Sequence, residues 1–403
     1  MTEELLLNGH NADVNCVALR SNGQVASGSG RSIIVHSTSS NKVEYRADNV
    51  FAQVLGLCNL PNGSLVACGY DSEGGILKIF SPSLELVQTL EGHDGYVWCV
   101  TVSPSGSHFA SGGGDGKLMI WSESGEGDEW ARVQVLEDHT DMIYAVCFSP
   151  DGKQLATGGV DKSINLYSFN EGSAILAHTL EGHTSLVYSL SFSPDCKLLC
   201  SGSFDRSIKF WNPADRSLVK SIDQAHTWSV WSVSYSPNGR VLVSAGYDKT
   251  MKIWDAETFE LKHMFEQEFN TNHLTITADS NFIVSANEDN TVRFTPCREY
   301  QFTSLTPILN LILHIVYKRD FVSFPKHSRR TPTHAHTIRL LGECVFNGGY
   351  DVTSVILSFL SPTHLPIQIT PTRWKSKRKK EGEGEGEGEG EGEGEGEGTK
   401  KPN

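Results

Sequence analysis

Apolar and polar residues alternate over short stretches that recur along most of the chain. Residues 144–148 (YAVCF) and 188–192 (YSLSF) have the period of two that is typical of a half-buried β-strand. Turn sequences such as residues 149–152 (SPDG) and 236–239 (SPNG) follow these stretches on a regular schedule. Glycine is abundant, at 38 residues, which also suits a turn-rich β protein. The pattern therefore predicts many short strands and argues against a bundle of long helices.

These stretches belong to a repeat with a period of 40 to 46 residues. Four copies share one interval of 28 residues between a histidine and an aromatic residue, in the pairs His93/Trp121, His139/Tyr167, His183/Trp211 and His226/Trp254. Weaker copies end at His36, Phe80 and Phe294, which makes seven copies. Each copy holds four short strands, with an outer one such as residues 218–222. One such sheet cannot bury both of its faces, so we expect the seven units to stack radially.

With these motifs the chain resembles the WD-repeat family of β-propellers over about residues 3–294. The resemblance is strong in copies three to six and weaker elsewhere. It implies an all-β fold, a seven-bladed propeller spanning residues 1–297. In this family the N-terminus supplies the outer strand of the last blade, and residues 4–7, three of them apolar, are correctly placed to pair with the blade that ends at Phe294. Closure of the ring would remove the exposed sheet edges that favour aggregation.

A histidine, a hydroxyl residue, an aspartate and an aromatic residue recur at matching offsets in the strong copies. The first three are also the components of a nucleophilic triad. The set occurs four times, however, whereas catalysis needs one copy on an exposed, strained turn. The resemblance implies instead a hydrogen-bond network that ties the strands of each blade together, and we expect no catalytic residue. The expected network comprises His93, Ser111, Asp115, Trp121, His139, Thr157, Asp161, His183, Ser201, Asp205, Trp211, His226, Ser244, Asp248 and Trp254.

Three blades depart from this network. Blade one has Gly30 where the aspartate would fall and His36 in the aromatic position, and blade two has Ala67 in place of the hydroxyl residue. Blade seven keeps Ser285 and Asp289 but lacks the Gly-His pair. A buried polar group left without its partner costs about 1–3 kcal/mol. We therefore expect the seam between blades seven and one to be the weakest part of the ring.

Aromatic residues recur at two further positions of the repeat, five residues after the histidine and just before the aspartate. The resemblance implies that both positions border the mouth of the central channel, where peptides commonly dock in this family. The expected partner-binding residues are Tyr70, Trp98, Tyr144, Tyr188, Phe204, Trp231 and Tyr247. The alternative is that these rings only plug the mouth or pack between blades.

The charge balance indicates the class of partner. The chain has 34 Lys plus Arg against 48 Asp plus Glu, a net charge of -14. Residues 1–294 alone hold 19 basic and 35 acidic residues, a balance of -16. An acidic protein is poorly suited to bind nucleic acid or an anionic membrane, and we expect neither. Aromatic faces in an acidic field instead favour Arg or Lys side chains of a protein or peptide.

These observations lead to a functional hypothesis. The chain is interpreted as a non-enzymatic scaffold, with a monomeric propeller that holds a basic peptide segment at its aromatic mouth. The alternative is the substrate-recognition module of a ubiquitin ligase, with a C-terminal ligase domain missing from this gene model. The two differ in whether ubiquitin-transfer components accompany the full-length gene product.

Nine cysteines are scattered along the chain, and the N-terminal residues have no apolar signal segment. We therefore expect reduced thiols in a protein of the cytoplasm or the nucleus. Cys196 and Cys200 are four residues apart, but no second pair follows at the spacing of zinc ligands. The sequence indicates no metal site and no cofactor.

The composition changes after about Cys297. Residues 298–380 mix Pro, His and short apolar runs without a pattern, and we expect no folded domain there. Residues 381–403 begin with nine Glu-Gly dipeptides and are expected to be disordered, because they offer no apolar surface. We interpret residues from about 300 onward as translated intron or downstream sequence, and a transcript that spans this junction would contradict that interpretation.

Overall fold

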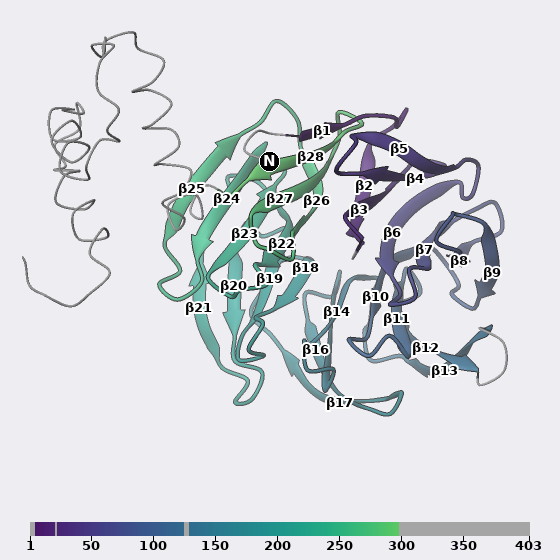
Figure 1. Cartoon of the computed structure of the whole chain (residues 1–403). Coiled ribbons are helices and arrows are strands. Elements are labelled where there is room, and N and C mark those ends of the chain that lie inside the picture. The colour runs from purple at the N-terminus through teal and green to yellow at the C-terminus, as the bar shows by residue number, and fades with distance from the viewer. Residues whose placement is uncertain (1–4, 21, 125–128, 298–403) are drawn as a thin grey trace, which may run out of the picture. The chain divides into compact units, whose positions relative to one another are not determined.

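A computed structural model describes residues 5–20, 22–124 and 129–297. The expected segments 298–380 and 381–403 lie outside the described residues. Within the described part the chain forms seven antiparallel sheets of four strands each and no helix, so the predicted all-β, seven-bladed propeller is confirmed. Figure 1 shows these sheets, the blades, following one another around a common centre.

Blades one to six each consist of four consecutive strands, ordered from the channel outward. Blade one holds β2 (Val14–Leu19), β3 (Gln24–Ser29), β4 (Ser32–Ser37) and β5 (Lys42–Ala47). Blade two holds β6 (Gln53–Asn59), β7 (Leu65–Tyr70), β8 (Gly75–Phe80) and β9 (Leu86–Glu91). Blade three holds β10 (Val97–Val102), β11 (His108–Gly113), β12 (Leu118–Ser124) and β13 (Glu129–Leu136).

The remaining blades follow the same plan. Blade four holds β14 (Ile143–Phe148), β15 (Gln154–Gly159), β16 (Ile164–Asn170) and β17 (Ser173–Leu180). Blade five holds β18 (Val187–Phe192), β19 (Leu199–Ser203), β20 (Ile208–Trp211) and β21 (Leu218–Ile222). Blade six holds β22 (Val230–Tyr235), β23 (Val241–Gly246), β24 (Thr250–Asp255) and β25 (Leu261–Glu266). Blade seven holds β26 (Thr271–Ile276), β27 (Phe282–Asn287), β28 (Val292–Pro296) and the N-terminal β1 (Leu5–Leu7).

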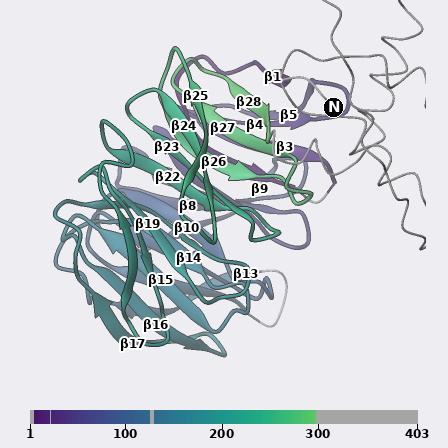
Figure 2. The same ribbon diagram turned by 90° about the vertical axis from the view of Figure 1, so that its left-hand side faces the viewer.

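The N-terminal strand closes the ring. β1 pairs antiparallel with β28, as expected from the sequence, and the register places Leu5 opposite Phe294. In Figures 1 and 2 the purple β1 lies along the green β28, although the two strands come from opposite ends of the described chain. Leu7 is fully buried in the cluster between blades seven and one. The outer edge of β28 is therefore covered by paired backbone rather than exposed.

The hydrophobic core is divided into seven clusters, one at each interface between neighbouring blades. Successive side chains of a strand point to opposite faces of its sheet, so each blade contributes to the clusters on both of its sides. The blades pack so closely that one glycine is required at the interface of blades three and four. A Cβ atom on Gly112 would lie 2.5 Å from Cγ2 of Ile143. The small residues that end the second strand of each copy thus make room for the next blade.

Candidate binding site at the channel mouth

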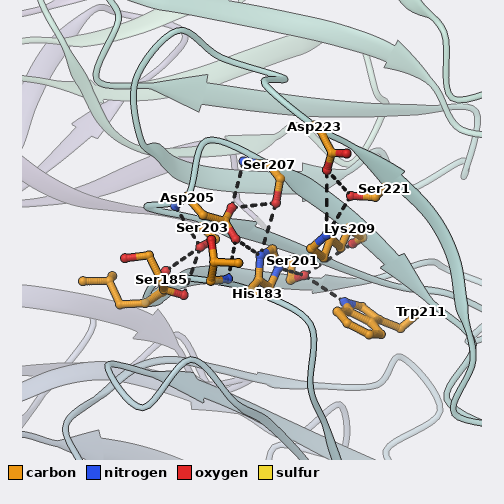
Figure 3. Close-up of polar contacts among 12 residues, drawn as sticks. His183, Ser185, Ser201, Ser203, Asp205, Ser207, Lys209, Trp211, Ser221 and Asp223 are labelled. Atoms are coloured by element: carbon orange, nitrogen blue, oxygen red, sulfur yellow. Dashed lines mark hydrogen bonds and ion pairs between the residues drawn. The ribbon is translucent and has the colours of Figure 1, made fainter.

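The recurring polar residues form one linear hydrogen-bond chain in each of blades three, five and six. In blade five the Trp211 Nε1–H donates to Ser201 Oγ (2.9 Å), and His183 Nε2 lies 2.7 Å from the same hydroxyl (Figure 3). His183 Nδ1 lies 2.9 Å from Asp205. This hydrogen-bond chain runs from Trp211 on the third strand through Ser201 on the second strand to His183 and Asp205 on loops at one end of the blade. It therefore links the strands of the blade to one another.

The other complete copies have the same contacts. Their members are His93, Ser111, Asp115 and Trp121 in blade three, and His226, Ser244, Asp248 and Trp254 in blade six. In blade four His139 contacts Thr157 and Asp161, while the buried hydroxyl of Tyr167 has no hydrogen-bond partner. The four hydroxyl residues of these chains are fully buried, so a substrate could not reach them. This arrangement suits a scaffold and not a nucleophile.

The carboxylates of these chains are held ionised. Burial by itself would raise the pKa of Asp205, but hydrogen bonds from His183 and Ser207 outweigh it and lower the pKa well below its usual value. The backbone N–H groups of Thr184 and Ser207 also donate to the same carboxylate. In Asp161 the same balance, with burial opposed by His139 and Ser163, lowers the pKa to about 2.

The weak blades carry incomplete chains. In blade one His10 Nε2 lies 2.7 Å from Ser27 Oγ, and Ser32 Oγ lies 3.4 Å from His10 Nδ1, much as Ser207 Oγ lies beside His183 in blade five, but Gly30 leaves this chain without its aspartate. In blade seven the Ser285 hydroxyl is buried without a hydrogen-bond partner. His36, in the aromatic position of blade one, likewise leaves its Nδ1 buried and unpaired. Sequence departures thus correspond to unpaired polar atoms on both sides of the seam between blades seven and one.

Every innermost strand carries a β-bulge at the same place. In each blade the pairing of the first and second strands shifts by one residue near the start of the first strand. A bulged residue is left out of the ladder and its side chain is re-aimed. The seven bulged residues are Asn15, Leu55, Trp98, Tyr144, Tyr188, Trp231 and Asn272, and all of them line the central channel. The channel has a volume of about 330 Å³.

The bulged aromatic residues of blades three to six belong to a continuous arc of rings, which we call the aromatic arc. Neighbouring ring centroids are separated by 3.9 Å at the closest contact, Tyr70 with Tyr96, and by 5.8 Å at the widest, Tyr96 with Trp98. The arc comprises Tyr70, Tyr96, Trp98, Tyr144, Tyr188, Trp231 and Tyr247 in contact order. Six of the seven expected aromatic residues therefore meet, and Tyr96 joins them although it was not predicted from the sequence.

Phe204 is the expected residue that does not join the arc. It lies on a loop at the same end of the blades, where its N–H bonds to the carbonyl of Leu186, but its ring contacts none of the others. Its side chain is 44% exposed. Tyr96 is equally exposed at 44%, and Tyr247 at 41%. Trp228, three residues before the bulge of blade six, is the most exposed aromatic residue of this end at 56%.

Blades seven and one complete the mouth with amides instead of rings. Asn272 Nδ2 donates to the carbonyl of Val14 in blade one (2.9 Å), and Asn15 Nδ2 donates to the carbonyl of Val54 in blade two (2.7 Å). Val14 and Val54 are equivalent residues, each directly before a bulge. The mouth is therefore asymmetric, with aromatic rings over blades two to six and amides at blades seven and one.

The loops around the mouth carry more acidic than basic side chains. Asp13, Asp94, Asp141 and Glu268 are exposed on the loops that enter the innermost strands. The exposed charged side chains on the neighbouring loops are Glu73 and the cations Arg31, Lys162, Arg206 and Lys249, and each of the last three directly follows a network aspartate. The network aspartates themselves are bonded to histidines and turned inward.

The thiols contribute no reactive group to this site. No disulfide joins the eight cysteines of the described residues. Burial raises the pKa of Cys58 and of Cys99 to about 12, so both remain protonated at neutral pH. Within the same residues no group of three or more His, Cys, Asp or Glu side chains could hold a metal ion, and no helix is long and apolar enough to cross a bilayer.

Comparison with known proteins gives repeat-level similarity. A stretch of 75 residues is 39% identical to Protein transport protein SEC13 of Coccidioides immitis (strain RS), and it covers 17% of this chain and 25% of that protein. The protein of the same name from Chaetomium thermophilum (strain DSM 1495 / CBS 144.50 / IMI 039719) is 42% identical over 71 residues, 17% of this chain and 22% of its own. Ribosome biogenesis protein WDR12 homolog of Chlamydomonas reinhardtii is 54% identical over 50 residues, 12% of this chain and 11% of its own. The matches thus span a quarter or less of these relatives.

Five segments match the WD40 family, described as "WD domain, G-beta repeat". They are residues 2–37, 84–122, 130–168, 175–212 and 216–255. Each segment starts at the outer strand of one blade and continues through the three inner strands of the next. Blade one, a weak copy by its own sequence, is among those matched. Repeats of one kind thus continue from blade to blade in sheets that close into a seven-bladed ring, and the chain belongs to the WD-repeat family of β-propellers.

Proposed function

We propose that this propeller is a non-enzymatic scaffold that captures a basic segment of another protein at its aromatic mouth. The observation that carries the proposal is the aromatic arc, in which seven rings from five blades meet around one end of the channel. Exposed aromatic residues supply large contact areas with little loss of side-chain entropy, and they are enriched where proteins bind each other.

The charge of the propeller supports a basic partner. Residues 1–294 have a balance of -16, and carboxylates such as Asp94 and Asp141 stand on the loops beside the arc. A cation placed over an aromatic face gains about 0.5–2 kcal/mol, depending on how far it is desolvated. An acidic field around such faces also speeds the encounter with a cationic segment.

The competing interpretation is that the rings only pack against each other. Stacked pairs such as Trp231 with Tyr247 are consistent with packing, because each ring covers part of its neighbour. Packing alone does not explain why Tyr96, Tyr247 and Trp228 remain substantially exposed at the same end. A soluble protein rarely gathers such residues without a use for them.

The test is affinity capture with the full chain and with a Trp98→Ala/Trp231→Ala variant. A matched control is Leu86→Ala/Ile175→Ala, which removes two exposed apolar side chains on the outer strands. We expect the wild type and the control to retain the same proteins and the mouth variant to lose them. On an array of peptides from the retained proteins, the propeller should then bind those peptides that contain Lys or Arg.

Thermal unfolding of all three forms shows whether they fold equally well. A mouth variant that retains every partner would refute the proposal, and one that loses its fold together with its partners would favour packing. The names of the relatives point to both transport and ribosome biogenesis. Because they match over short stretches, we assign no pathway, and nothing in the described residues favours the ubiquitin-ligase alternative.

A further inference from the structure

The two amides at blades seven and one have a fixed orientation. Only the Nδ2 atom of an asparagine side chain can donate to a backbone carbonyl. The bonds from Asn15 to Val54 and from Asn272 to Val14 therefore identify the Nδ2 atom, and with it the Oδ1 atom, of each amide. Neither Oδ1 atom accepts a hydrogen bond from the described residues, and neither is buried. Two acceptor oxygens from adjacent blades are thus available at the channel.

These oxygens share the channel with the aromatic arc. The residues that line it include the two asparagines on one side and Trp98, Tyr144, Tyr188 and Trp231 on the other. No Asp, Glu, Lys or Arg is among the lining residues. His273 does line the channel, but burial lowers its pKa to about 4, so it is uncharged at neutral pH and does not repel a cation.

A donor-rich, flat cation suits this combination better than other side chains. A guanidinium group carries five N–H donors in one plane, and its faces stack on aromatic rings. An ammonium group is a more strongly hydrated point charge and cannot stack. A carboxylate would face two amide oxygens without a donor. The volume of about 330 Å³ lies at the lower end of the range of ligand pockets and can accept a single side chain.

We propose that the mouth is an arginine-specific anchor site, in which the guanidinium group donates to Oδ1 of Asn15 and Asn272 and stacks against the aromatic arc. This inference rests on the proposed capture of a basic segment and narrows it to one side chain. The aromatic arc supplies affinity for cations in general, and the two amides supply the preference for arginine over lysine.

The probes are three pentapeptides, Ac-Ala-Ala-X-Ala-Ala-NH2, in which X is arginine, lysine or citrulline. Citrulline keeps the planar shape but loses the charge. Titration of the full chain, followed by ligand-observed NMR, is expected to show the arginine peptide binding at least about tenfold tighter than the other two. Equal binding of lysine or citrulline, or no detectable binding of the arginine peptide, would overturn the proposal, and this comparison needs no variant.

An Asn15→Leu/Asn272→Leu variant tests the placement. Asn59→Leu is its matched control, because Asn59 Nδ2 makes the same kind of bond to a neighbouring blade, at the carbonyl of Leu19, away from the channel lining. We expect the preference for arginine over lysine to persist in the control and to vanish in the double variant. If Trp98→Ala/Trp231→Ala abolishes binding of basic peptides while the double variant keeps the preference, the proposed function stands and the anchor site is wrong.

Discussion

Replacing Asp205 with alanine is the sharpest test of the hydrogen-bond chains, because this carboxylate accepts four hydrogen bonds. It accepts hydrogen bonds from His183 Nδ1 (2.9 Å), from the N–H groups of Thr184 and Ser207 (2.9 Å each) and from Ser207 Oγ (2.6 Å). Figure 3 shows the bonds from His183 and Ser207 meeting at the Asp205 side chain. The His183 side chain is fully buried, so water cannot replace the lost partner.

The magnitude follows from the groups left behind. A buried polar group that loses its partner costs about 1–3 kcal/mol, and Asp205→Ala removes the partner of both His183 Nδ1 and Ser207 Oγ, so we expect the free energy of unfolding to fall by about 2–6 kcal/mol. Asp223→Ala in the same blade is the matched control. Its side chain is 82% exposed and lies 3.9 Å from Lys209 Nζ, so its loss should change the free energy of unfolding by less than about 1 kcal/mol.

Urea unfolding followed by tryptophan fluorescence measures both changes. The effect also has a pH signature, because the pKa of Asp205 is lower in the folded than in the unfolded chain. Its contribution is fully present above the unfolded value near 4 and is lost as the pH falls toward the folded value. The gap between wild type and Asp205→Ala should therefore narrow below about pH 4. Equal losses for Asp205→Ala and Asp223→Ala, or a gap that widens in acid, would refute this reasoning.

Two further predictions concern the seam between blades seven and one. Burial lowers the pKa of His273 to about 4, so on acidification the unfolded chain takes up a proton at this histidine before the folded chain does. The folded state therefore loses stability as the pH falls from about 6.5 toward 4. His273→Gln should flatten the dependence of the urea midpoint on pH over that range, and an unchanged slope would contradict this prediction. Deleting residues 1–8 removes β1 and exposes the edge of β28, so we expect a lower melting temperature and concentration-dependent association by light scattering, whereas deleting residues 1–4 should have neither effect.

The architecture could be predicted from the sequence because its determinants are periodic. A fixed interval between His93 and Trp121, repeated in other copies, reflects a hydrogen-bond chain that must span the same distance in every blade. The resemblance to the WD-repeat family implied that the N-terminus supplies the outer strand of the last blade, and the expected pairing of residues 4–7 is seen for residues 5–7. Repetition also identified four of the bulged residues, although the bulge itself leaves no mark in an alternating pattern.

The parts of the site that were missed are those that do not repeat. Tyr96 occupies a position that holds Met142 in blade four and Ser229 in blade six, so no pattern points to it. Asn272 could not be aligned with Asn15 because blade seven lacks the Gly-His pair that locates the strand start. The aromatic arc stops before blades seven and one, where amides take its place. Only the register of the innermost strands reveals this difference.

The bulge in each innermost strand separates the identity of the mouth from the stability of the fold. A bulged residue is left out of the backbone ladder. Its side chain can therefore change from Trp98 in blade three to Asn15 in blade one, while the preceding valines keep their places in the interface clusters. The side chains at the seven bulged positions can thus change one at a time while the propeller fold stays the same. A duplicated gene of this kind could acquire a new binding preference through a few codons, without first having to rebuild the protein that carries them.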